Sequence, residues 1–139
     1  MNLKASLLLL LTGAATVVIS AEKVSDMRLR QQAFMKTKLV YSQAILEGLT
    51  LEKYDLVSKN ALRMRNMSQE GDWFLKGEWF LKNNPDYKAA ITNFYRQTDS
   101  LFMAAADKNL DTAKEAYKKV VDSCVSCHVL FRAEQMKKR

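Results

Sequence analysis

One short run near the C-terminus holds the residue types that could carry chemistry. It reads Cys124-Val125-Ser126-Cys127-His128, and the chain's two cysteines and single histidine all lie within it. In a helix, positions i, i+3 and i+4 share one face, so both thiols and the imidazole would project to the same side. The spacing therefore predicts one site that uses two sulfur atoms and one ring nitrogen.

Covalent attachment of haem is the chemistry that this spacing fits best. C-x-x-C-H is the pattern of c-type haem attachment. Both thiols can add to the two vinyl groups of the haem while the imidazole reaches the iron. We therefore expect one covalent haem c, bound through Cys124 and Cys127, with His128 as an axial iron ligand.

Other interpretations of the same residues are less favoured. A zinc site needs four ligands, or three plus a water, and ligands packed this closely rarely close a tetrahedron. A thioredoxin-like redox pair belongs in a βαβ setting, of which the sequence gives no sign. A disulfide between Cys124 and Cys127 stays open for an exported chain, above all before haem attachment.

Long helices must position this run. With 4 Gly and 1 Pro among 139 residues, the chain has few turn residues, and no segment alternates convincingly as a strand does. The length fits one domain with a single core. Because short connections make neighbouring helices antiparallel, we predict an all-α fold, an antiparallel up-down-up-down four-helix bundle.

Start and stop residues divide the chain into four helices. The first is expected from about Ser25 to Glu47. The residues that end or begin helices are Gly48 after the first, Thr50 before the second, Asn84 with Pro85 before the third, and Asn109 or Asp111 before the fourth.

Each of the last three helices has a stripe at helical spacing that should face the core. The stripes are Tyr54, Val57, Ala61 and Met64; then Tyr87, Ile91, Phe94, Thr98, Leu101 and Ala105; then Ala113, Tyr117, Val120, Cys124, His128 and Phe131. Phe94 and Tyr117, with Tyr41 of the first helix, are expected to be ordinary core or haem-packing residues.

The first residues are of a different kind. After Lys4 the chain is apolar up to the small residues Ser20 and Ala21, which predicts a secretory signal peptide cleaved near Ala21. Its apolar run is shorter than a spanning helix needs, so we expect no stable membrane span after cleavage. The predicted parts are 1–21, signal peptide, and 22–139, a haem c bundle domain in the periplasm.

The charge balance bears on partners. Cleavage removes one basic residue and leaves 21 basic against 15 acidic residues, a net charge of +6. Such a surface can steer an acidic redox partner protein or lie near anionic lipid. Nucleic acid is not expected as a partner, because the chain is exported and carries no recognition motif.

The connection 71–84 repeats WFLK, at Trp73–Lys76 and Trp79–Lys82. We expect it to cover the open end of the bundle, with a partner-docking patch as the alternative.

Taken together, these features resemble the class II c-type cytochromes, the cytochrome c′ family and its low-spin relatives. Members are four-helix bundles whose haem motif lies on the last helix, followed by an aromatic and a basic residue. Here the run is CVSCHVLFR, with Phe131 and Arg132 in those places. An Arg-Gln pair one turn before the distal haem position is matched by Arg30-Gln31. The resemblance covers essentially all of 22–139 except the connection, where WFLK replaces the family's usual lead into helix three.

The resemblance also implies roles around the haem. It places Phe34 on the distal face, as in members with five-coordinate iron. A register shift of one residue would bring in Met35 as a sixth ligand instead, and Met27 is a weaker candidate. Arg30 and Arg132 are expected at the haem periphery, near a propionate and near the proximal face.

Two functions follow from the two distal arrangements. A six-coordinate iron indicates an electron carrier, which needs no catalytic acid, base or nucleophile, so we expect no enzyme. An open iron under Phe34 would bind small gases such as NO or CO, and this is the alternative. A helical bundle without haem is the least favoured hypothesis. A homodimer is among the arrangements that the resemblance allows.

Overall fold

The computed structural model describes residues 3–70 and 84–137, and it divides into two compact units. Residues up to Lys36 form the first unit and residues from Thr37 onward form the second. We describe each unit by itself. The connection 71–83, with its two WFLK runs, lies outside the described residues, as do the side chains of the predicted signal peptide.

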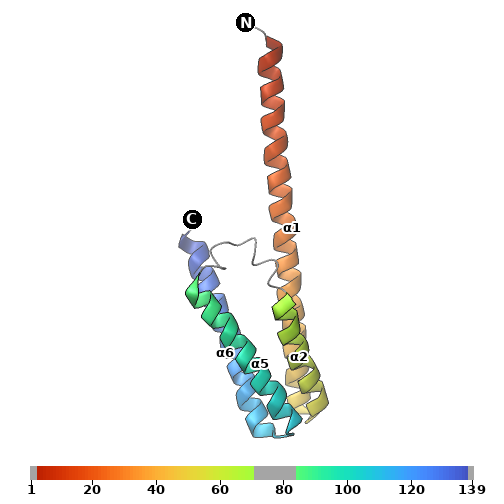
Figure 1. Ribbon diagram of the computed structural model, residues 1–139. Coiled ribbons are helices and arrows are strands. Elements are labelled where there is room, and N and C mark those ends of the chain that lie inside the picture. Colours follow the sequence, from red (N-terminus) through yellow and green to blue (C-terminus); the bar gives the residue numbers. More distant parts are fainter. Residues whose placement is uncertain (1–2, 71–83, 138–139) are drawn as a thin grey trace. The chain divides into compact units, whose positions relative to one another are not determined.

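Helices account for the described chain. They are α1 (Leu3–Thr50), α2 (Tyr54–Glu70), α5 (Pro85–Ala106) and α6 (Leu110–Lys137), and no strand occurs in residues 3–70 or 84–137 (Figure 1). The second unit contains the C-terminal part of α1 together with α2, α5 and α6. The predicted all-α fold, a four-helix bundle, is confirmed.

The end of α1 differs from the prediction. α1 runs from Leu3 to Thr50 rather than from Ser25 to Glu47, so it includes Gly48. Thr50 does not cap α2: it is the last residue of α1, and its hydroxyl donates to the carbonyl of Leu46 at 2.8 Å. The left-handed residue that ends the helix is Glu52, with φ of 53°.

Gly48 has a packing role instead of a stop role. A Cβ built there would lie 2.7 Å from Val57 Cγ2 and 3.2 Å from the Lys53 carbonyl oxygen, so α1 and α2 approach each other too closely for any side chain. The Lys53 N–H donates to the Gly48 carbonyl at 2.8 Å, which completes the hydrogen-bonded end of the helix.

The turn between α5 and α6 also contains a left-handed residue and a backbone hydrogen bond that ends the helix. Lys108 takes the left-handed conformation with φ of 54°, and the Asn109 N–H donates to the carbonyl of Ala104 at 3.2 Å. The Asn109 side chain then accepts from the Thr112 N–H at 3.0 Å, so Asn109 rather than Asp111 caps α6. At the start of α5, Asn84 accepts from the N–H groups of Asp86 and Tyr87, as predicted.

The core of the second unit is made of the predicted stripes. Val57, Ala61 and Met64 of α2 are buried, as are Phe94, Thr98, Leu101 and Ala105 of α5 and Ala113 and Val120 of α6. Alanines are frequent among them because small side chains let helices approach closely. Ile45 and Leu49 add the contribution of α1.

Polar contacts tie the helices to one another. The Tyr117 hydroxyl on α6 donates to the Ser42 carbonyl of α1 at 3.0 Å and lies 2.9 Å from the Ser42 hydroxyl. Arg65 Nε on α2 lies 2.7 Å from Asp99 Oδ1 on α5, an ion pair whose angle falls outside hydrogen-bond geometry. In the described part of the chain, no helix is both long and apolar enough to cross a membrane.

Candidate haem-attachment site

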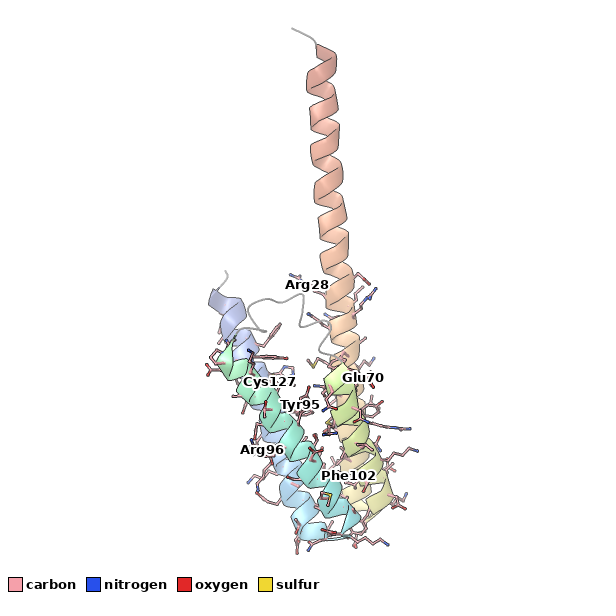
Figure 2. The ribbon with its side chains drawn as sticks, in the orientation of Figure 1. Arg28, Glu70, Tyr95, Arg96, Phe102 and Cys127 are labelled. Atoms are coloured by element: carbon pink, nitrogen blue, oxygen red, sulfur yellow. The ribbon has the colours of Figure 1, made fainter. Side chains whose placement is uncertain are left out.

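The two cysteines lie on α6 where its buried face becomes half-buried. Ala116, Val120 and Ser123 are buried, and this face continues through Cys124 and Cys127, both half-buried. Figure 2 marks Cys127 on α6, in the half of the unit that also holds Tyr95, whereas Phe102 lies nearer the turns. The two thiols therefore occupy one face of one helix, as the spacing predicts.

The prediction that His128 lies on the inward stripe of α6 is wrong: its side chain is exposed, beside the face that holds the cysteines. It is flanked on the outer side of α6 by Val125 and Val129, which are 55% and 50% exposed. Among the described residues, no group of three His, Cys, Asp or Glu side chains converges to hold a metal ion. The motif therefore does not form a zinc cage by itself, whereas attachment through two thioethers needs no such convergence.

Burial governs the chemistry of the thiols. Burial raises the pKa of Cys124 and of Cys127 above 9.0, and the nearby Lys38 amine opposes this shift at both. Both groups are therefore neutral thiols near neutral pH, which fits an unreacted attachment pair.

Lys38 of α1 carries a positive charge that interacts electrostatically with both cysteines. Its amine lies 4.6 Å from the centroid of the Phe94 ring, within the range of a cation–π contact. Burial lowers its pKa from 10.5, while electrostatic attraction to Cys124 and Cys127 acts in the opposite sense. α1, α5 and α6 thus each contribute a residue to one cluster: Lys38, Phe94 and the two cysteines.

The hydrogen-bonded pair Ser42–Tyr117 fixes the register of α1 against α6 beside the cluster. Ser42 is one turn after Lys38 on α1, and Tyr117 lies two turns before Cys124 on the same face of α6. A sliding of either helix would break this contact, so it holds Lys38 opposite the motif.

The other predicted site residues are exposed or half-buried. Arg132 on α6 is exposed. Phe34 is half-buried, Met35 is 39% exposed, and Arg30 forms an exposed ion pair with Asp26 at 2.8 Å. All three belong to the first unit, and their roles at a distal face stay predictions.

Sequence reasoning missed Lys38, although a signal for it was present. Tyr41, Ile45 and Leu49 continue an inward stripe of α1 at helical spacing, and Lys38 occupies the next position on the same stripe. A lysine on an otherwise apolar stripe is uncommon, since burial of its charge is costly. The Met27 side chain, a weaker candidate of the sequence, lies outside the described residues.

One known family model matches the part of the chain that holds both cysteines. Residues 77–132 match the family model for cytochrome c′. The resemblance to the class II c-type cytochromes is confirmed over this segment. No curated protein and no solved structure matches the chain.

The cytochrome c′ match contains Cys124, Cys127 and His128, and it supports a c-type cytochrome haem protein. The structure fits such a group on its own observations. Two half-buried thiols three positions apart share a helix face, a histidine follows at the next position, and Cys124 packs against the apolar core that contains Phe94. Cys124 and Cys127 are the residues that would hold the haem, with His128 beside them.

Proposed function

We propose that the protein is a periplasmic monohaem c-type cytochrome that carries electrons, with one haem attached covalently to Cys124 and Cys127 and with His128 as an axial ligand of the iron. The observation that carries this proposal is the pair of half-buried thiols on one face of α6, followed directly by the only histidine, within the segment that matches cytochrome c′.

The residues of the chain have a binding role in this function. Bound haem supplies a reversible one-electron couple of iron. Cys124 and Cys127 fix the haem to α6, and the Ser42–Tyr117 contact holds α1 against this helix. Electron transfer needs no catalytic acid, base or nucleophile, so the proposed protein is not an enzyme.

Partner and location follow from charge and from the N-terminal sequence. The segment 1–21 has the features of a signal peptide, which supports export to the periplasm. The net charge of +6 that remains after cleavage supports an acidic redox protein as partner, because opposite charges speed encounter.

Covalent attachment is tested by expressing the full chain in bacteria that export and mature c-type cytochromes. Haem should stay with the protein on a denaturing gel, and N-terminal sequencing should begin near Glu22. Replacing both cysteines by serine should remove the haem stain. Ser126→Ala, between the two cysteines, is the matched control and should keep it. A parent protein without denaturation-resistant haem would contradict the proposal.

Electron transfer is separated from gas binding by visible spectra of the loaded protein, ferric and ferrous, before and after CO. A low-spin ferrous spectrum that CO leaves unchanged, with a reversible redox titration, is the expected result. A high-spin spectrum with ready CO binding would overturn the electron-transfer role and favour the gas-binding alternative. His128→Ala should change the iron spectrum while both thioether bonds remain.

A further inference from the structure

Lys38 is a half-buried lysine on the inner side of α1 in the second unit. The stripe to which it belongs is otherwise apolar or aromatic, with Tyr41, Ile45 and Leu49 packed in or against the core. Placing an amine there costs free energy of solvation, which a Leu or Met would avoid. A costly residue in a core is expected where function uses it.

The Lys38 amine is held over an aromatic ring of α5 and interacts electrostatically with the cysteines of α6. Its nitrogen lies over the Phe94 ring of α5 at 4.6 Å, and it interacts electrostatically with both Cys124 and Cys127 of α6. The Phe94 ring is buried, 5% exposed, and the Ser42–Tyr117 contact one turn further along holds α1 in place. These contacts therefore restrict the motion of the Lys38 ammonium group.

We propose that Lys38 is a positioning residue of the haem site whose ammonium charge favours the reduced form of the bound haem. This inference rests on the proposed function. Thioether formation would leave both sulfurs neutral, so the charge of Lys38, which interacts electrostatically with both cysteines, would act on the haem that they hold. Oxidation of the iron adds one positive charge nearby, and like charges repel more strongly in a partly buried site than in water.

The direction of the effect follows from this repulsion. A positive charge near the iron raises the free energy of Fe(III) relative to Fe(II), so it raises the reduction potential. Removing the charge should lower the potential. With an effective dielectric constant near 20, a unit charge about 12 Å from the iron would change the Fe(II)/Fe(III) equilibrium about tenfold, or about 59 mV for one electron.

The test is a redox titration of the loaded full-length protein at about pH 6, where lysine is protonated. Lys38→Met removes the charge and keeps an unbranched side chain of similar length. Lys38→Arg keeps the charge. Lys118→Met is the matched control, because it removes a lysine that is exposed on the same helix as the motif. Haem staining and the visible spectrum are recorded for every variant.

We expect Lys38→Met to lower the reduction potential, which shifts the Fe(II)/Fe(III) equilibrium about tenfold toward Fe(III), with covalent haem and spin state unchanged. The potentials of Lys38→Arg and Lys118→Met should stay near that of the parent. Equal shifts of the reduction potential in Lys38→Met and Lys118→Met would overturn the inference, because the effect would then not depend on where the lysine lies. A changed spin state in Lys38→Met would also overturn it, because a change of iron ligand would then account for the potential. Loss of covalent haem from the parent protein is a different result, which contradicts the proposed function itself.

Discussion

The two ends of the bundle within the second unit are built on different principles. At the turn end, defined by residues 45–61 and 101–116, Ile45, Ala61, Leu101 and Ala113 are completely buried. At the motif end, defined by Lys38, Phe94, Cys124 and Cys127, a charge and two thiols are half-buried around one buried ring. The turn end is a closed apolar core, whereas the motif end places a charge and two thiols in half-buried positions.

This contrast is local, because the same helices form both ends. α6 passes from Ala113 and Ala116, where its inner face is closed, to Cys124 and Cys127, where it is half open. Stability is therefore expected to reside at the turn end and haem chemistry at the motif end, so substitutions at the two ends should separate the two properties.

The largest effect is expected from Leu101→Ala at the turn end. The Leu101 side chain is fully buried, and its truncation leaves a cavity that should destabilise the protein by about 2–5 kcal/mol. Urea unfolding followed by circular dichroism measures this change. Val125→Ala, at a 55% exposed position of the motif end, is the control and should change stability by no more than about 0.5 kcal/mol. Similar losses in both variants would break the contrast.

Gly48→Ala should be the next most disruptive change. The added Cβ would lie 2.7 Å from Val57 Cγ2 and 3.2 Å from both the Lys53 carbonyl oxygen and the Val57 nitrogen, so we expect a loss of about 1–3 kcal/mol. Adding Val57→Ala removes the closest of these contacts. The cost of the double variant should therefore be smaller than the sum of the two single costs in a double-mutant cycle. Simple additivity would mean that this contact does not limit the helix approach.

Lys108→Gly should stabilise the turn end. Lys108 has φ of 54°, a conformation that costs an L-residue about 1 kcal/mol and costs Gly little. We expect a gain of about 1 kcal/mol in thermal or urea unfolding. The same exchange at Lys119, in the interior of α6, should do the opposite and cost about 1 kcal/mol, because Gly is a poor helix former. A loss at both positions would mean that the turn does not store this strain.

The smallest effect on stability concerns the motif end. In a haem-free chain with both cysteines replaced by serine, Lys38→Met should increase stability, because burial lowers the pKa of Lys38 and so disfavours its charged form in the fold. This cost is fully present below the folded pKa and disappears as the pH rises to 10.5. The advantage of Lys38→Met should therefore shrink between neutral pH and about pH 10.5, which urea unfolding at several pH values measures. A constant advantage would mean that the charge is not its cause.

Much of the fold could be predicted because its signals are local. Asn84 with Pro85 marks the start of α5 through hydrogen bonds within one turn, and the stripe from Val57 to Met64 follows from the helical period alone. The exact end of α1 could not be predicted in this way. Gly48 looks like a stop, yet tertiary packing against Val57 uses it inside the helix.

The sequence by itself determined that Cys124 and Cys127 share one face of a helix, because an i, i+3 spacing does so in any helix, and that His128 follows directly. It also determined the all-α class through periodicity and the scarcity of Gly and Pro. Only the tertiary structure decided that Lys38 meets Phe94 and the two cysteines. These residues are far apart in the chain, and helical periodicity says which residues share a face but not which faces of different helices meet. Packing of the core and the Ser42–Tyr117 contact set that register.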